Sequence, residues 1–243
     1  VLNNTNVKNI GLCNVPIDML DDIKETTGPD VDITYVGLNH LSWVTSIKKD
    51  GKELITDMIN QGYKAKVMAN IQDDGIGLDC LKAVNAIPSS YLQYYYCREA
   101  KLQHQRDDEK TRAQVCMEIE EQLLKMYQDE ELCVKPALLD KRGGHKYSLA
   151  AVNLINSLAN DVGDIKNNGT LDFLEDDDVI EAPCIIDKDG AKPIKVTDFH
   201  NKHIINLIRI VKAYEKYTVE AATTGNENAA INGLLIHPLV GDY

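Results

Sequence analysis

The fold of this 243-residue chain is decided by residues 31–48, VDITYVGLNHLSWVTSIK. The alternation over Val31–Gly37 is typical of a half-buried strand, and Trp43–Lys48 is predicted to be its antiparallel neighbour. Asp50-Gly51 then marks a turn at the far end of the pair. His40 is therefore expected in the connection between two strands, where an imidazole can point into a cleft.

Helical periodicity surrounds this pair of strands. Helices are predicted at Ile17–Lys24, Lys52–Gln61, Leu78–Ala86, Tyr91–Lys101, Asp107–Asp129, Tyr147–Asn160, Lys202–Glu220 and Ala229–Ile236. Further short β segments are predicted at Val7–Leu12, Val179–Ile186 and Ile194–Val196. An apolar stripe along the longest helix is expected to be core: Cys116, Ile119, Leu123, Met126 and Tyr127. The mixture predicts an α+β fold, rich in helices, with short and mostly antiparallel strands.

Composition narrows the class of protein. An apolar content of 44% with 26% charged residues is ordinary for a globular chain. The net charge of −12 argues against nucleic-acid binding, which needs a basic surface, and it disfavours an anionic membrane. A phosphorylated substrate would need local basic groups set against this acidic field.

The six cysteines are scattered without a CxxC pair. A chain of this length does not need disulfides to be stable, so free thiols in a reducing compartment are expected. No window reaches the roughly 18 consecutive apolar residues of a membrane span, and the first residues lack a secretion pattern. The sequence predicts a cytoplasmic location.

Three short segments place reactive side chains where the local pattern breaks. GLCNVP (residues 11–16) carries the thiol of Cys13, GLNHLSW (37–43) the imidazole of His40, and IPSSYLQYYY (87–96) the phenol of Tyr91. A cysteine and a histidine that converge can hold a divalent metal, and a nearby tyrosine can act as a base. Alone, the spacing of Cys13 and His40 matches no zinc-finger pattern, and a strand-end cysteine is more often a small buried hydrophobe.

Tyr91 is predicted in the first turn of a helix that Ser89 or Ser90 caps. The positive end of a helix and an adjacent metal both favour an ionised tyrosine, despite its ordinary pKa of about 10. The structural alternative is an amphipathic core tyrosine whose hydroxyl reaches water. His200 and His203, at the start of a later helix, could also bind a metal, and surface or capping roles explain them equally well.

In this order the three segments resemble glycoside hydrolase family 4, whose members depend on NAD and a divalent metal. The CNVP version looks like the 6-phospho-β-glucosidase branch. The resemblance implies that Cys13 and His40 are metal ligands, with manganese as the expected metal. It also implies that Tyr91 is the catalytic base, with Tyr147 as its rival, and that the substrate is a phosphorylated disaccharide or an aryl glucoside.

The same resemblance implies a set of substrate-binding residues. Asn14 and Asn39 would lie near the sugar hydroxyls, and Asn14 favours the β branch because relatives acting on α-linkages tend to carry an acid there. Arg142 would bind the phosphate, beside Gly143 and Gly144, or would only pair locally. Lys166 lies near the place where relatives have an arginine.

The resemblance covers only the C-terminal part of such an enzyme. Residues 1–243 are expected to form a single C-terminal substrate- and metal-binding domain, resembling that of the lactate dehydrogenase-like and family 4 proteins. The N-terminal dinucleotide-binding domain is expected to be absent, because the nearest match to its fingerprint, Gly75–Cys80, lacks the third glycine and the preceding apolar strand. In the family, NAD oxidises the sugar at carbon 3, which acidifies the carbon-2 proton that the tyrosine removes. The present chain is therefore expected to be inactive by itself.

Two other functions stay open at this point. One is the substrate domain of a lactate- or malate-dehydrogenase-like oxidoreductase, which would rely on a histidine base and an arginine clamp. The other is a non-catalytic interaction domain in which Cys13 and His40 are core residues. Apolar helical surfaces also suggest a homodimer or a higher homo-oligomer.

Overall fold

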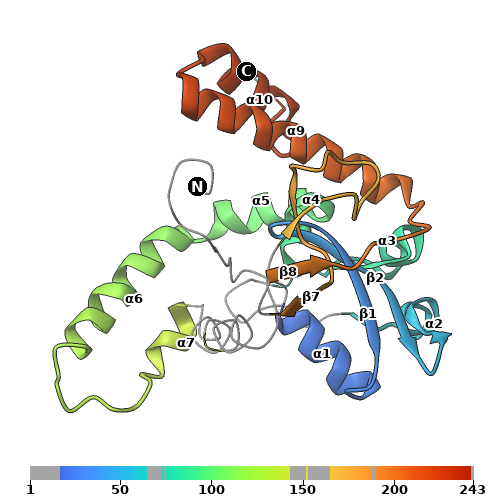
Figure 1. The fold of residues 1–243 in the computed structure, drawn as a ribbon. Coiled ribbons are helices and arrows are strands. Elements are labelled where there is room, and N and C mark those ends of the chain that lie inside the picture. Colours follow the sequence, from blue (N-terminus) through green and yellow to red (C-terminus); the bar gives the residue numbers. More distant parts are fainter. Residues whose placement is uncertain are drawn as a thin grey trace.

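The computed structural model describes residues 17–64, 73, 75–142, 152, 165–187 and 190–241. It confirms a helix-rich α+β fold with short antiparallel strands (Figure 1). The helices are α1 (Ile17–Thr27), α2 (Ile55–Asn60), α3 (Leu78–Val84), η2 (Ser90–Leu92), α4 (Gln93–Tyr96), α5 (Arg98–Asp107), α6 (Arg112–Met126), α7 (Leu138–Arg142), α9 (Lys202–Thr224) and α10 (Glu227–Ile236). The strands are β1 (Asp32–Leu38), β2 (Leu41–Lys49), β3 (Lys52–Glu53), β4 (Ile87–Pro88), β5 (Ile165–Lys166), β6 (Val179–Ile180), β7 (Cys184–Asp187) and β8 (Gly190–Pro193).

The β1–β2 hairpin forms as the sequence predicts. The strands pair antiparallel from Asp32 opposite Lys48 to Leu38 opposite Leu41, with an irregularity between Thr34 and Tyr35. β3 and β4 both pair with β2, which makes β2 the central strand of this sheet. The two residues between β1 and β2 are Asn39 and His40, so His40 does lie in the connection.

Side chains on the two faces of this sheet belong to two apolar cores. Val36, Leu38, Leu41 and Trp43 pack in the core that includes Ile204 and Ile208 of α9. The other core contains Val44 and Ile47 of β2, Ile23 of α1, and Ile55 and Ile59 of α2. Burying each such side chain contributes roughly 1.5–3 kcal/mol, which fixes the register of the hairpin. Figure 1 shows α1 below β1 and β2 and α9 above them.

Sequence periodicity misplaces the start of one helix and the position of one strand. The predicted Lys52–Gln61 helix begins only at Ile55, because Glu53 is in β3 and its carboxylate accepts hydrogen bonds from the backbone N–H groups of Leu54 and Ile55. Residues 194–196 are not a strand. The strand lies earlier, at Gly190–Pro193, where it pairs with β7.

The predicted Tyr91–Lys101 helix is divided at Cys97. The backbone of Cys97 has φ −123° and ψ 36°, so η2 and α4 end there and α5 begins with a new direction. The consequence is that Tyr91 lies on a short helical segment of its own, rather than on a long helix.

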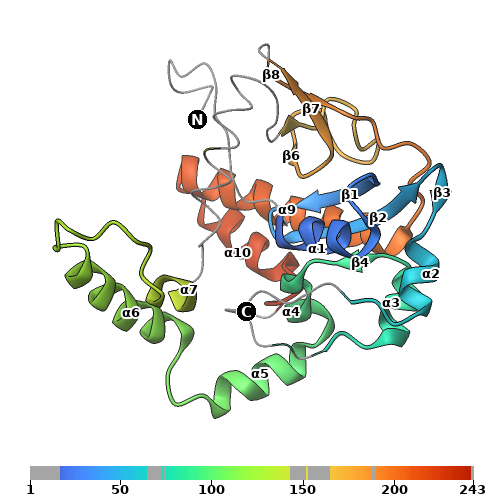
Figure 2. The same ribbon diagram turned by 90° about the horizontal axis from the view of Figure 1, so that it is seen from below.

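Helices α6 and α7 form an arm that both ribbon views show away from the sheet (Figures 1 and 2). The α6 helix starts with a capping box between Thr111 and Gln114. The expected buried stripe is only partly right: Ile119 and Leu123 are buried, whereas Met126 and Tyr127 are 39% and 50% exposed. Periodicity predicts which face of α6 is apolar, but it does not reveal how much of that face other elements cover.

The predicted helix at 147–160 and the predicted strand at 7–12 lie outside the described residues. The cysteines that the structure describes are not joined in disulfides: Cys80, Cys97, Cys116, Cys133 and Cys184. Within the described ranges, no helix is both long enough and apolar enough to cross a membrane.

Gly37 is the residue on which the hairpin geometry depends. A Cβ at this position would lie 2.2 Å from the carbonyl oxygen of Leu41 and 2.5 Å from the Cα of Ser42, both backbone atoms of β2. The Gly37 backbone also exchanges two hydrogen bonds with Glu181, at 3.0 and 2.9 Å. Glycine is therefore required here by the close approach of two strands.

We predict that Gly37→Ala lowers the free energy of unfolding by about 1–3 kcal/mol or more, since the added methyl group must displace backbone. Urea denaturation measures the change. Gly77→Ala is the matched control, because a Cβ there meets no atom within 4 Å, and it should cost less than about 1 kcal/mol. Equal effects of the two substitutions would contradict the packing account.

Candidate active site

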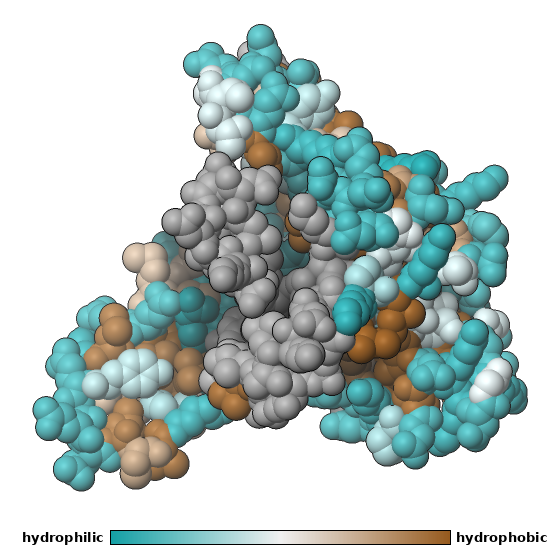
Figure 3. Space-filling view, in the orientation of Figure 1, coloured by the Kyte–Doolittle hydropathy of each residue, from teal (hydrophilic) through white to brown (hydrophobic). Residues whose placement is uncertain are grey.

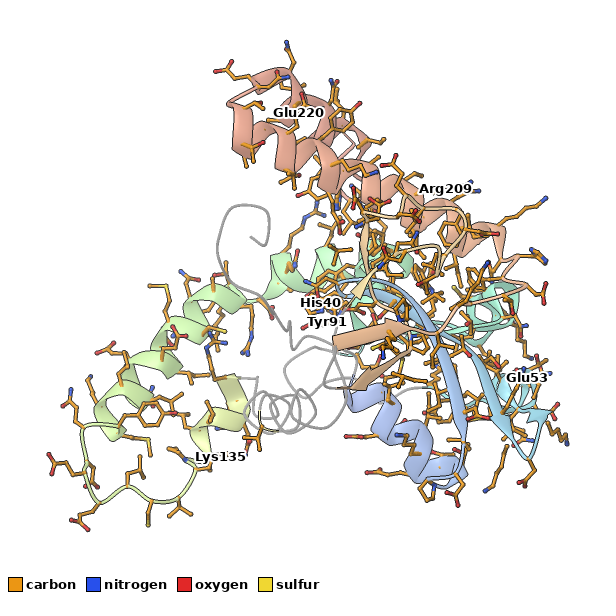
Figure 4. The ribbon with its side chains drawn as sticks, viewed as in Figure 1. His40, Glu53, Tyr91, Lys135, Arg209 and Glu220 are labelled. Carbon is orange, nitrogen blue, oxygen red and sulfur yellow. The ribbon has the colours of Figure 1, made fainter. Side chains whose placement is uncertain are left out.

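His40 and Tyr91 are stacked on each other. Their ring centroids are 3.9 Å apart, with an angle of 30° between the ring planes. Figure 4 shows the two labelled side chains together in the middle of the molecule. Two of the three reactive side chains singled out in the sequence, far apart along the chain, are thus in direct contact.

The hairpin turn presents the imidazole. His40 has a φ of +63°, in the left-handed region that residues other than glycine rarely adopt. Such a conformation costs of order 1–3 kcal/mol and persists only where surrounding contacts hold it. Asn39, the other turn residue, is exposed, whereas His40 is half-buried. The turn therefore directs His40 inward and leaves Asn39 at the surface.

Strand β4 brings Tyr91 to that turn. Ile87 pairs with Val44 and Pro88 with Trp43, so the chain runs along β2 toward the hairpin turn. Pro88 is tolerated because β4 is an edge strand of only two residues. Three residues after Pro88, the chain reaches Tyr91 beside His40.

Ser89 fastens the two segments together. Its backbone N–H donates to the carbonyl oxygen of Ser42 at 2.9 Å, and its Oγ donates to the carbonyl oxygen of His40 at 2.8 Å. Sequence reasoning predicts this serine as a helix cap. It does occupy the N-cap position of η2, but its hydroxyl makes no capping bond because it binds the hairpin turn instead. Sequence reasoning does not reveal this bond, because the acceptor, the carbonyl oxygen of His40, is 49 positions away in the chain.

The helix that carries Tyr91 is shorter than expected. Tyr91 lies in the 3₁₀ turn η2, which is followed by the four residues of α4. So few peptide units give only a small helix dipole, and the dipole adds little support for an ionised Tyr91. The argument for a base at Tyr91 therefore depends on its contact with His40.

Burial lowers the pKa of the His40 imidazole below its ordinary value of 6.5. The ring is consequently neutral at pH 7, which is the form that binds a metal through a ring nitrogen. In this respect His40 fits the ligand role that the resemblance implies. No three side chains of His, Cys, Asp or Glu form a metal-binding group among the residues that the structure describes.

Several of the predicted site residues cannot be placed relative to His40 and Tyr91. Cys13, Asn14 and the rival base Tyr147 lie outside the described residues. Lys166 is in β5, whose backbone pairs with β6, and the position of its side chain is also outside the description. The structure therefore places His40, Asn39 and Tyr91 at one turn.

Arg142 lies on α7 and contacts α6. Its Nε and Nη2 donate to Oε1 of Glu120 at 2.9 and 2.7 Å, and its carbonyl oxygen accepts from Arg112. This is the local pairing that the sequence left open beside phosphate binding. The side chains of the pair are 39% and 50% exposed, so the pair adds little to stability.

The chain matches the model of a glycosyl hydrolase family and curated relatives that are named 6-phospho-β-glucosidases. The model of the family 4 glycosyl hydrolase C-terminal domain matches residues 35–240. The chain is 37% identical to a probable 6-phospho-β-glucosidase of Bacillus subtilis over 96% of its own length and 56% of that protein. It is 35% identical to the 6-phospho-β-glucosidase BglT of Thermotoga maritima, over 97% of the chain and 57% of that protein. The chain thus spans about half the length of the curated relatives it matches.

Solved structures agree with the sequence matches. The 6-phospho-β-glucosidase of Thermotoga maritima, in a crystal with NAD and glucose-6-phosphate, superposes with a TM-score of 0.81 at 30% identity, covering 96% of this chain and 56% of that one. Another crystal of that enzyme contains manganese, NAD⁺ and glucose-6-phosphate and gives a TM-score of 0.79 at the same identity. The range matched by the family model, residues 35–240, includes both His40 and Tyr91.

We predict that the pKa of His40, measured by NMR titration, lies below 6.5, and that Tyr91→Ala raises it toward 6.5 by uncovering the ring. Because the folded pKa is the lower one, the unfolded chain takes up the proton first. The stability contribution of this group is therefore fully present above pH 6.5 and is lost as the pH falls below it. Tyr127→Ala, on the arm, is the control and should leave the pKa unchanged. A His40 pKa at or above 6.5 would show that the ring is not buried in this way.

Proposed function

The chain belongs to the family 4 glycosyl hydrolases, and on that premise we propose that it is the C-terminal part of a 6-phospho-β-glucosidase. The single observation that carries the proposal is the stack of His40 on Tyr91, since it joins the expected metal ligand and the expected base at one turn. Family membership also weakens the two functions that the sequence left open, a dehydrogenase substrate domain and a non-catalytic interaction domain.

The proposed substrate is a phosphorylated β-glucoside, either a disaccharide or an aryl glucoside. Identity to relatives named 6-phospho-β-glucosidases is 33–37%, against 26% to the phospho-α-glucosidase PagL of Clostridium acetobutylicum. Asn14 supports the same choice, because an amide cannot donate a proton as an acid would. Glucose-6-phosphate in the Thermotoga structure is in keeping with a phosphorylated sugar.

We assign a divalent metal, with manganese as the expected ion, to Cys13 and His40. A neutral imidazole and a thiolate are ligands that such an ion accepts, and two protein ligands leave positions for substrate oxygens. When bound, the metal would supply Lewis-acid polarisation of sugar oxygens, and NAD would supply the hydride acceptor. NAD is expected to bind outside this chain, in a dinucleotide-binding domain of the intact protein.

The residues of this chain then act on the sugar directly. Tyr91 removes the carbon-2 proton, and its stacking on the half-buried His40 ring holds it at the same turn. Asn39 and Asn14 bind sugar hydroxyls, while Arg142 and Lys166 contribute positive charge for the phosphate. In that role Arg142 would have to exchange its Glu120 partner for the substrate, which its partial exposure permits.

The same reasoning extends to the organisation of the protein. Residues 1–243 are proposed to form one substrate- and metal-binding domain that has no turnover without the dinucleotide-binding domain. The cytoplasmic location stays a prediction, motivated by the described cysteines, which are not joined in disulfides. Mixing this chain with NAD, manganese and an aryl 6-phospho-β-glucoside should release no aglycone, and turnover by the chain alone would contradict this organisation.

In the intact enzyme we predict that Tyr91→Phe lowers kcat by about two to four orders of magnitude, the usual contribution of a general base. The measurement is steady-state release of the aglycone from a chromogenic aryl 6-phospho-β-glucoside. Tyr94→Phe is the matched control: it removes a hydroxyl three residues away on the same segment and should leave kcat within about twofold. Near-normal turnover by Tyr91→Phe would refute the assignment of the base.

We also propose that the intact protein is a homo-oligomer that uses the outer face of α6. Met117 and Leu124, one heptad apart on this helix, are 68% and 64% exposed, and Tyr127 next to them is 50% exposed. Figure 3 shows apolar residues at the surface of this arm. Contiguous apolar surface of this kind is typical of interfaces.

The double substitution Met117→Glu and Leu124→Glu is predicted to reduce the oligomer to monomers in sedimentation experiments, because it places charges in the buried contact. Val219→Glu on α9, where the valine is 62% exposed, is the control and should leave the assembly intact. An oligomer that survives the double substitution would exclude this face as the interface.

A further inference from the structure

A chain of hydrogen bonds runs from the hairpin strand β2 to the first turn of α9. The Nε1–H of Trp43 donates to the hydroxyl of Tyr96 at 3.1 Å, and this hydroxyl lies 2.9 Å from Nε2 of His203. Trp43 is fully buried, three residues after His40. Tyr96 is the last residue of α4, five residues after Tyr91. The chain thus starts near one site residue and passes through the helix that carries the other.

The chemistry of the indole fixes the direction of the first of these bonds. An indole N–H can only donate, so the Tyr96 oxygen accepts from Trp43. Burial raises the pKa of Tyr96 to about 12, with the Trp43 bond lowering it and Cys80 raising it, so the phenol keeps its proton at neutral pH. The direction of its bond with Nε2 of His203 depends on the tautomer of the histidine, and in either direction the two side chains are joined at 2.9 Å.

The segment from Tyr91 to Tyr96 is fastened at both ends to the same stretch of hairpin. At the start, the Ser89 hydroxyl holds the His40 carbonyl, and at the end Tyr96 holds Trp43. Five residues of helix rise roughly 8 Å, and three residues of strand roughly 10 Å. These lengths are similar, so Tyr91 can lie on His40 while Tyr96 lies against Trp43.

We propose that Tyr96, held between Trp43 and His203, is a positioning residue that keeps Tyr91 stacked on His40. The proposal rests on the proposed function for its catalytic consequence, but the positioning itself is a property of the fold. The short segment cannot position itself, because an η2–α4 unit of seven residues is too short to be a stable helix alone. Its orientation therefore depends on tertiary contacts, which are the burial of Leu92 and Gln93 in its middle and the hydrogen bonds at its two ends.

The start of α9, which carries the exposed His203, is fixed by contacts of its own. Asn201 caps α9 by accepting from the N–H of Ile204, and its Nδ2 donates to the carbonyl oxygen of Val84 at 2.7 Å. Ile204, next to His203, is fully buried. Val84 ends α3 just before β4 and the Tyr91 segment. The same α9 turn thus holds the chain before β4 and the end of α4.

The test uses Tyr96→Phe in the intact enzyme, with selective labelling of Trp43, the only tryptophan in the chain, and of histidine rings. Three results are expected. The Trp43 indole N–H resonance moves upfield and exchanges faster with solvent. The His40 ring protons lose part of the ring-current shift that Tyr91 gives them. The kcat per folded molecule falls about tenfold, with KM changing less than about twofold, because the base is displaced while substrate binding remains.

Two variants of His203 separate positioning from general destabilisation. His203→Gln keeps a hydrogen-bond partner for the Tyr96 hydroxyl and should retain the wild-type His40 shift and kcat. His203→Leu removes that partner and should behave as Tyr96→Phe does. Tyr94→Phe is the matched control on the same segment and should leave all three readouts unchanged.

Each contrary outcome has a distinct meaning. An unchanged Trp43 resonance in Tyr96→Phe would overturn the hydrogen-bond chain. A changed Trp43 resonance with an unchanged His40 shift and an unchanged kcat would overturn the positioning role. If the wild-type enzyme does not turn over any 6-phospho-β-glucoside, the proposed function fails, and the His40 ring-current shift still decides the positioning role.

Discussion

The pairing of β4 with β2 is the interaction on which the candidate site depends. It consists of two residues, Ile87 and Pro88, laid against Val44 and Trp43, and it is continued by the two hydrogen bonds of Ser89. This contact closes a long loop of chain, and the loop-closure entropy must be offset by burial on both sides of the sheet. Fully buried Ile87 and Trp43 supply that burial. Without this contact, Tyr91 and His40 would have no reason to meet.

The hairpin turn at His40 and the short helical segment of Tyr91 would each be unstable in isolation. In the folded protein they stabilise one another through direct contacts. His40 adopts a left-handed φ at the tip of a hairpin, and its carbonyl group is held by Ser89. Tyr91 lies on a segment too short to be stable alone, and its ring covers the imidazole. A strained backbone and a half-buried ionisable side chain thus coincide at His40. Both features are common at functional sites. They also explain the neutral imidazole, because the aromatic cover removes water from His40.

The sequence predicts the parts of this site that obey local rules. Alternation over Val31–Gly37 and the turn at Asp50-Gly51 locate the hairpin, and with it the place of His40 between two strands. The position of Tyr91 in a first helical turn is right, because Pro88 and the two serines after it mark a helix start.

What local rules cannot show is the partner of each polar group. The Ser89 hydroxyl binds the hairpin turn instead of capping its helix, and Glu53 ends β3 by accepting bonds that periodicity does not register. The contacts of Trp43, Tyr96 and His203 likewise join three elements that are distant in sequence. The exposed apolar residues of α6 show that periodicity predicts an apolar helix face without predicting whether that face is buried.

The central claim is that the thiol of Cys13, the imidazole of His40 and the phenol of Tyr91 line one metal-dependent site. Anomalous scattering from manganese in crystals of the intact protein tests it most directly. The account predicts a manganese peak within bonding distance of both a ring nitrogen of His40 and Sγ of Cys13, with the Tyr91 ring still stacked on His40. Manganese bound elsewhere, with Cys13 and His40 on different sides of the molecule, would contradict it.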